Sequence, residues 1–277
     1  MKTFSLRALI VAIAMMVFAP PAAHAAGPFD NWAGVFIAGD FRAHSGADSE
    51  VFDNGRRDVA KAFVDAGLKK ENTVQFSVRP ELYADTPEKP FASRPGPIND
   101  QIDKVTDKAK DGCVFFMTSH GSPDGIVVGN ILMRPSEMAR LLDKACGKKP
   151  TLVIVSSCFS GVFVPMVAAP NRVVMTAARP DRSSFGCGES DTYTFFDTCL
   201  LQELPAAGTF DVLANNVRGC VEKRETELGM RPPSEPQSFV GEEIKGKLST
   251  YALAQHPPTQ VGAADPNAPI ILPRSRY

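Results

Sequence analysis

Two stretches decide the fold: residues 113–122, CVFFMTSHGS, and residues 152–161, LVIVSSCFSG. Each opens with an apolar run of strand length and ends in small polar residues, a pattern typical of a strand covered on both faces of a parallel sheet. Between them, Pro135–Ala145 carries apolar residues at helical spacing and is followed by Gly147, which predicts a helix. A strand, a helix and a second strand in this order indicate a βαβ unit.

The rest of the chain continues this alternation. Further strands are expected at Ala33–Ala38, Thr73–Val78, Arg172–Ala177 and Gln237–Val240. Further helices are expected at Asp58–Gly67, Ile98–Ala109 and residues 193–203 and 210–225. A proline-rich stretch over residues 79–97 predicts a long surface loop, and Gly125–Leu132 predicts a small hairpin. The fold class is therefore α/β, a three-layer α/β/α sandwich around a mostly parallel sheet of about six strands.

Composition indicates one domain of ordinary size in a chain of 277 residues. Lys and Arg total 30 and Asp and Glu total 31. This balance gives no electrostatic reason to expect nucleic acid or an anionic membrane as a partner. The oligomeric state is left open.

The first 25 residues have the pattern of a signal peptide. Lys2 and Arg7 precede the apolar run Ala8–Phe18, and Ala23-His24-Ala25 fits a cleavage site. As a membrane anchor the run is too short to cross a hydrocarbon core of ~30 Å comfortably. The expected organisation is a signal peptide at 1–25, one α/β domain at 26–253 and a loose, Pro-rich tail at 254–277. The mature protein is expected in the periplasm or the medium, with no stable membrane anchor.

All six cysteines follow the predicted signal peptide, and an oxidising compartment permits disulfides. If one cysteine stays a free thiol, five remain, so at least one more is unpaired. Cys113 and Cys146 each precede a neighbouring strand, which makes them candidates for a bridge at the edge of the sheet where these strands begin. The spacings contain no CxxC and no zinc pattern, so no metal is expected.

His120 and Cys158 each follow one of the two apolar strands predicted within residues 113–122 and 152–161. Because loops at the carboxyl ends of adjacent parallel strands share one sheet edge, the two side chains are expected within reach of each other. An imidazole beside a thiol favours the thiolate, which is the nucleophile of thiol catalysis. The N–H groups of Gly121 and Cys158 are candidates for an oxyanion hole. Taken singly, the cysteine could instead be an inert core residue and the histidine a structural one.

The two loops resemble the histidine and cysteine motifs of the legumain family of cysteine peptidases. A third stretch, residues 176–185 (TAARPDRSSF), resembles the segment that follows the next strand in that family. The resemblance covers roughly residues 32–200 and implies a caspase-like fold, a Cys158–His120 dyad and hydrolysis of peptide bonds in an exported, bacterial-type enzyme. It also implies a peptide or protein as substrate and no cofactor.

The resemblance implies further site residues. Asn54 is the nearest match to an asparagine that supports the catalytic histidine in the family. Arg56 or Arg57 corresponds to an arginine of the pocket for the residue before the cut, and Asp191 to an aspartate there. As ordinary structural residues, the arginines would form a solvated helix start and Asp191 a helix cap.

Ser156 stands where the family has a pocket acid, which removes one negative charge from the expected pocket. Ser183 and Ser184, in the third stretch, are further candidates for substrate contact. The expected pocket is polar, between residues 54–57 and 178–191. It would favour Asn or Asp before the cut if an arginine dominates and a basic residue if Asp191 does, and the resemblance favours Asn.

Two alternatives remain open at this level. A transamidase would use the same dyad and differ only in the acceptor of the acyl group. A non-catalytic binding protein on a caspase-like scaffold would lack thiol reactivity at Cys158. A serine hydrolase of the α/β-hydrolase type is disfavoured because the sequence contains no G-x-S-x-G elbow.

Overall fold

The computed structural model describes residues 27–253. The predicted signal peptide (1–25) and tail (254–277) lie outside the described residues. Within residues 27–253, no helix combines the length and the apolar character that crossing a bilayer requires.

The centre of the fold is one seven-stranded sheet in the order β10-β9-β8-β4-β1-β2-β3. Its strands are β1 (Trp32–Ala38), β2 (Thr73–Ser77), β3 (Phe91–Ala92), β4 (Gly112–Thr118), β8 (Thr151–Ser156), β9 (Arg172–Thr176) and β10 (Gln237–Val240). Neighbouring strands run parallel except β10, which is antiparallel to β9. The mostly parallel sheet is confirmed. It has one strand more than expected because the two-residue β3, inside the proline-rich stretch, pairs with β2.

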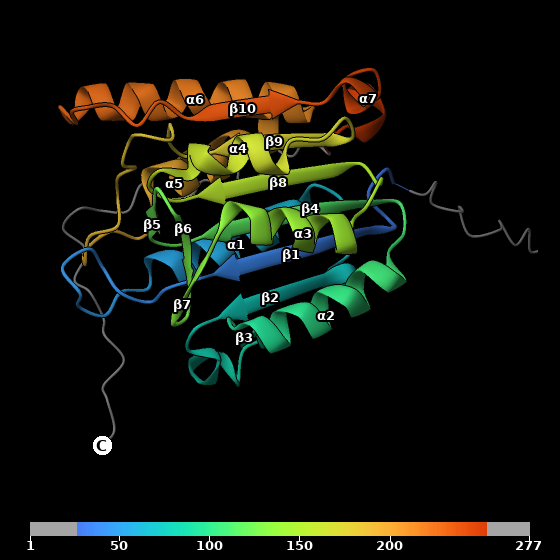
Figure 1. Ribbon diagram of the computed structural model, residues 1–277, viewed down its shortest axis with the longest axis horizontal. Helices are drawn as coiled ribbons and strands as arrows, with labels where there is room; N and C mark the ends of the chain where they lie inside the picture. Colours follow the sequence, from blue (N-terminus) through green and yellow to red (C-terminus); the bar gives the residue numbers. More distant parts are fainter. Residues whose placement is uncertain (1–26, 254–277) are drawn as a thin grey trace, which may run out of the picture.

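Helices cover both faces of the sheet, as Figure 1 shows. They are α1 (Val51–Asp65), α2 (Pro95–Lys108), α3 (Pro135–Ala145), α4 (Val164–Val167), α5 (Phe195–Glu203), α6 (Phe210–Glu227) and α7 (Glu242–Lys245). Short 3₁₀ helices lie at Lys70–Asn72, Pro80–Tyr83, Ser160–Phe163, Leu204–Ala206 and Leu248–Tyr251. One core joins the sheet to α1, α5 and α6, and the other joins it to α2, α3 and α4. The expected three-layer sandwich is confirmed.

Strand β4 shows why residues 113–117 are apolar throughout and do not alternate with polar residues. Val114 and Phe116 belong to one core, whereas Phe115 and Met117 belong to the other. Both faces of the strand are therefore buried, and a polar side chain on either face would lose its water.

Helix α1 begins at Val51, seven residues before the start expected from the sequence. Val51 and Phe52 are buried at its amino end, and tertiary packing there outweighs the polar character of the surrounding residues. Helix α2 begins at Pro95, inside the stretch expected to be a loop. Proline fits the first turn of a helix because its missing N–H has no partner there.

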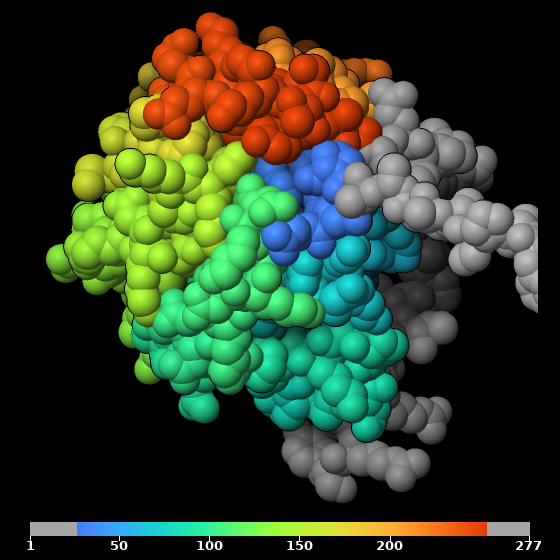
Figure 2. Space-filling model, turned by 90° about the vertical axis from the view of Figure 1, so that its right-hand side faces the viewer, coloured from blue at the N-terminus to red at the C-terminus, as the bar shows by residue number. Residues whose placement is uncertain are grey.

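A second, small sheet lies beside the carboxyl ends of the central strands, on the left of Figure 1. It consists of β5 (Gly121–Ser122), β6 (Gly125–Val128) and β7 (Ile131–Met133), and its β6–β7 turn confirms the predicted hairpin. Figure 2 faces the opposite edge, where the blue start of β1 lies beneath the red segment that carries α7. The carboxyl ends of β1, β4, β8 and β9 thus share the edge that carries the motif loops.

Candidate active site

The register of β4 and β8 brings the two motifs together. Thr118, the last residue of β4, pairs with Ser156, the last residue of β8. Ser119 N–H continues the ladder by donating to the carbonyl of Ser156 at 3.1 Å. The loops of His120 and Cys158 therefore leave the sheet from the same level on neighbouring strands, as the sequence predicted.

Gly121 packs directly onto the loop of Cys158. A Cβ added at Gly121 would lie 2.3 Å from the carbonyl oxygen of Cys158 and 2.7 Å from Oγ of Ser157. Real side-chain carbons do not approach oxygen so closely, so only glycine fits at this contact. The residue after His120 thus touches the backbone of Cys158 at its carbonyl oxygen.

The backbone turns sharply after Cys158. Phe159 has φ 56° in the left-handed region, which is uncommon for a bulky residue and often marks a functional site. Its N–H donates to the carbonyl of Arg182 at 2.8 Å, and Ala178 N–H donates to Oγ of Ser160 at 3.1 Å. The third stretch that resembles the family, residues 176–185, is therefore bound to the cysteine loop on both sides of its turn.

His120 is held by a backbone carbonyl and an aromatic ring. Its Nε2 lies 2.9 Å from the carbonyl oxygen of Arg42, in the loop after β1. The ring of Phe52, on α1, meets the imidazole edge to face with ring centroids 5.0 Å apart. A carbonyl only accepts hydrogen bonds, so Nε2 is the protonated nitrogen. The lone pair of the neutral ring is therefore on Nδ1.

The Cys158 thiol is held by Ser184. Ser184 N–H donates to Sγ at 3.3 Å, and Sγ lies 3.5 Å from the carbonyl and 3.6 Å from the hydroxyl of the same residue. The structure gives Sγ these partners rather than a direct hydrogen bond to His120. Such contacts are often long in free enzymes and tighten when substrate binds.

Asn54, the predicted support of the histidine, donates from Nδ2 to the carbonyl of Thr192 at 3.2 Å. The structure brings Arg42 rather than Asn54 to His120. The reason is the early start of α1: Asn54 lies in its first turns and faces the segment before α5.

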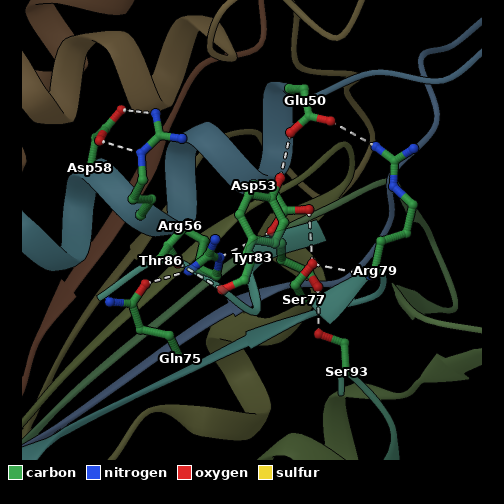
Figure 3. Close-up of polar contacts among 12 residues, drawn as sticks. Glu50, Asp53, Arg56, Asp58, Gln75, Ser77, Arg79, Tyr83, Thr86 and Ser93 are labelled. Atoms are coloured by element: carbon green, nitrogen blue, oxygen red, sulfur yellow. Dashed lines mark hydrogen bonds and ion pairs between the residues drawn. The ribbon is translucent and has the colours of Figure 1, made fainter. Parts of the chain in front are cut away.

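Arg56 lies in a buried network rather than at an open pocket (Figure 3). Its side chain is fully buried and pairs with Asp53 at 3.1 Å. Gln75 accepts from its guanidinium, which also lies over the ring of Tyr83. Ser77 donates to the other oxygen of Asp53 at 3.0 Å. With these partners on α1 and β2, Arg56 has no exposed surface for a substrate.

The other predicted pocket residues surround the same edge. Arg57 is partly exposed and pairs with Asp58 at 2.8 Å. Asp191 accepts from the N–H of Gly188 at 2.7 Å. Ser183 is exposed, whereas Ser156 is buried with its hydroxyl 3.3 Å from that of Thr194. Of the predicted pocket residues, Ser183 is exposed, Arg57, Ser184 and Asp191 are partly exposed, and Arg56 and Ser156 are buried.

The cysteines divide as the sequence predicted. Cys113 is bonded to Cys146, and Cys199 to Cys220. Cys158 and Cys187 are free thiols. Burial, followed by the negative charge of Cys158 and that of Asp191, raises the pKa of Cys187 to about 11, so this thiol stays protonated at neutral pH. No group of three or more metal-binding side chains occurs in residues 27–253.

Sequence reasoning missed four groups around the dyad. They are the carbonyl of Arg42, the ring of Phe52, the thiol of Cys187 and the carboxyl of Asp197. A backbone carbonyl has no sequence signal. Phe52 lies in a polar stretch where no helix was expected, and Asp197 lies among apolar neighbours that predict only core. Cys187 was the unpaired thiol that the count of cysteines required, but its place in the fold was not predictable.

The fold and the edge that carries a thiol and an imidazole define a class, the α/β proteins of the caspase fold. Caspase-1 from Spodoptera frugiperda, a crystal structure, superposes with a TM-score of 0.54 at 13% identity, and the match covers 80% of this chain and 92% of that chain. At this identity the likeness shows the fold alone. It confirms the caspase-like sandwich expected from the sequence.

Within that fold, residues 97–216 match the model of the peptidase C13 family, the family of legumain. The matched range contains His120, Cys158 and Asp191, whereas Asn54, Arg56 and Arg57 precede it. A search of curated proteins found no match. The family match together with the fold supports cysteine peptidase activity in general.

Proposed function

We propose that the protein is a cysteine endopeptidase that hydrolyses peptide bonds with Cys158 as nucleophile and His120 as its base. The observation that carries the proposal is the packing of Gly121 onto the carbonyl of Cys158, which joins the two motif loops at one sheet edge. The match to the peptidase C13 family over residues 97–216 supports the reaction class.

The hydrogen bonds of His120 suit a general base. Because Nε2–H donates to the carbonyl of Arg42, Nδ1 of the neutral ring is free to accept a proton. The Arg42 carbonyl also stabilises the imidazolium that forms when Nδ1 takes the proton of the thiol. Ser184 N–H donates to Sγ and can keep donating when the sulfur becomes a thiolate.

The proposed reaction has two halves. Nδ1 of His120 takes the proton from Sγ of Cys158, and the thiolate attacks the carbonyl carbon of the scissile bond. The carbon–nitrogen bond breaks, the proton passes from Nδ1 to the leaving amine, and a thioester remains on Cys158. Water then gives a proton to Nδ1 and attacks the thioester, which releases the acid product and restores the thiol.

The developing oxyanion needs hydrogen-bond donors close to the attacking sulfur. The N–H groups of Gly121 and Cys158 are proposed for this role because the two residues are in van der Waals contact. Backbone donors are fixed by the strand register and cost no reorganisation during the reaction.

We infer that the pocket for the residue before the cut favours a polar side chain that donates hydrogen bonds. Arg56 is enclosed in its network, and the guanidinium of Arg57 is paired with Asp58. The predicted pocket residues that keep accessible surface include the exposed Ser183 and the partly exposed Asp191. These groups suit an asparagine amide or a basic side chain better than an aspartate.

We propose that the protein is exported to the periplasm or the medium. The charged, apolar and small-residue order of residues 1–25 supports this proposal. The bonds Cys113–Cys146 and Cys199–Cys220 support it independently, because disulfides persist in oxidising compartments.

The test is digestion of a mixed peptide library by the purified protein, with mass spectrometry of the fragments. The matched variants are Cys158→Ala and Cys187→Ser, because these are the two free thiols. The wild type and Cys187→Ser should cut the library and Cys158→Ala should not. Cleavage by Cys158→Ala at near wild-type rate would contradict the proposal. An added amine that is incorporated into the products would identify a transamidase instead.

A further inference from the structure

Asp197 is a fully buried carboxyl beneath the edge that carries the dyad. It lies in the first turn of α5 with 0% of its surface exposed. The hydroxyl of Thr118 donates to Oδ2 at 2.7 Å. Helix α1 approaches so closely that a Cβ on Gly55 would lie 2.6 Å from the same oxygen. Strand β4, α1 and α5 therefore meet at this carboxyl.

A second set of contacts leads from Asp197 to β8. Asp197 N–H donates to the hydroxyl of Thr194, which caps α5, at 3.0 Å. That hydroxyl lies 3.3 Å from the hydroxyl of Ser156. Ser156 ends β8 two residues before Cys158, and Thr118 ends β4 two residues before His120. Asp197 is thus connected to the ends of both strands that carry the proposed dyad, through its carboxyl to β4 and through its N–H and Thr194 to β8.

The carboxyl lacks a compensating cation. Burial raises its pKa to about 6, and the hydroxyls of Ser156, Thr118 and Thr194 oppose this rise by hydrogen bonding. Its Oδ1 has no hydrogen-bond partner within residues 27–253. None of the titratable and charged groups on the elements around Asp197 is among the causes of its raised pKa. These groups are Asp53, Arg56, Arg57 and Asp58 on α1, His120 after β4, Cys158 after β8, Cys187, Glu189, Asp191 and Tyr193 before α5, and Arg224 on α6.

We propose that Asp197 is a positioning residue of the peptidase reaction, which fixes the ends of β4 and β8 relative to each other through Thr118 and through Thr194 and Ser156. This inference rests on the proposed function of the dyad. A buried carboxyl without a partner cation costs stability, and neither this carboxyl nor the Thr118 hydroxyl that donates to it would be needed for a purely apolar contact between α5 and the sheet.

Above about pH 6 the carboxyl is ionised, and its Oδ2 accepts the hydrogen bond from the Thr118 hydroxyl. Protonation neutralises the carboxyl and weakens this hydrogen bond, because a bond to an ionised acceptor is the stronger one. The connection between α5 and the end of β4 is weakened with it. The positions of His120 and Cys158 relative to each other are then less firmly fixed, so kcat should fall as the pH drops through the pKa of Asp197.

The experiment compares Thr118→Val, Asp197→Ala and Asp197→Asn with Thr106→Val. Thr106 is a buried threonine on α2, whose hydroxyl bonds the carbonyl of Ile102 away from the site. Each protein is measured for kcat and KM on a peptide that the wild type cuts, from pH 5 to 8. Thermal melts give folding, and mass spectrometry gives the rate at which iodoacetamide alkylates Cys158.

Thr118→Val and Asp197→Ala should lower kcat at least tenfold with KM within threefold, while Thr106→Val loses comparable stability and keeps its kcat. Asp197→Asn should retain most of the kcat at pH 8, because its amide oxygen still accepts from Thr118. It should lack the fall in kcat and in Cys158 alkylation that the wild type shows near pH 6.

Superimposable pH profiles of the wild type and Asp197→Asn would overturn the proposal. So would a loss of kcat in Thr118→Val no larger than in Thr106→Val. If Asp197→Ala does not fold, the isosteric Thr118→Val and Asp197→Asn still decide. Loss of activity in Cys158→Ala with no effect of the Asp197 variants would refute this inference alone, whereas full activity of Cys158→Ala would refute the proposed function.

Discussion

Replacing Gly121 by alanine should separate the two motif loops. The added Cβ would lie 2.3 Å from the carbonyl oxygen of Cys158, whereas ordinary contact begins at 3.4 Å. One of the loops must therefore move by about 1 Å, at a stability cost of ~1–3 kcal/mol, the usual range for overpacking. A shift of this size in a catalytic constellation costs on the order of 100-fold in rate, or about 2.7 kcal/mol in activation free energy.

The assay is kcat/KM on a peptide substrate, with thermal melts to confirm folding. Gly219→Ala is the matched control, because Gly219 is exposed on α6 and a Cβ there meets nothing within 4 Å. The control should keep its activity and gain up to ~1 kcal/mol of stability, as expected for Gly→Ala inside a helix. A folded Gly121→Ala protein within threefold of the wild-type kcat/KM would refute the close packing of His120 and Cys158 loops as the basis of activity.

Three further predictions follow from the buried groups and the pocket. The pKa of Asp197 in the folded protein is raised from 3.8 to about 6, so its contribution to stability is full below pH 3.8 and is lost as the pH rises through 6. Between pH 4 and 7 the free energy of unfolding of the wild type, measured with denaturant, should therefore fall by ~3 kcal/mol, and that of Asp197→Asn should not. Arg56→Ala should destabilise the fold by ~3–5 kcal/mol by leaving Asp53 buried without its partner, and an intact melting temperature with altered peptide preference would assign Arg56 to the pocket instead. Asp191→Ala should change which residue is accepted before the cut in a peptide library, and an unchanged preference for a large apolar residue would exclude the proposed pocket.

The central elements were predictable because burial leaves a simple mark on the sequence. Strand β4 is apolar on both faces, so Cys113–Thr118 could only be an inner strand, and the loop after it had to lie at the carboxyl edge. The same logic placed the loop of Cys158 beside the loop of His120. The meeting of the two loops at one sheet edge was thus predictable from two strands and the helix between them.

The surroundings of the dyad were not predictable, since they depend on loop paths and on partners far apart in the chain. Arg42 reaches His120 with a backbone carbonyl, which any residue type would supply. Arg56 was a pocket candidate through the family resemblance, and the sequence gives no sign that Gln75, 19 residues away on β2, is its partner. Asp197 follows two phenylalanines inside a core helix, and only the fold reveals that Thr118 points to it.

The dyad is tested most directly by the kinetics of Cys158→Ala, His120→Ala and the double variant on one peptide substrate. If Cys158 and His120 act as one catalytic unit, each single variant should lose nearly all activity while it remains folded. The double variant should then be little worse than either single one, because the second change removes a group that has already lost its partner. Losses that multiply in the double variant, or a single variant close to the wild-type rate, would contradict the dyad.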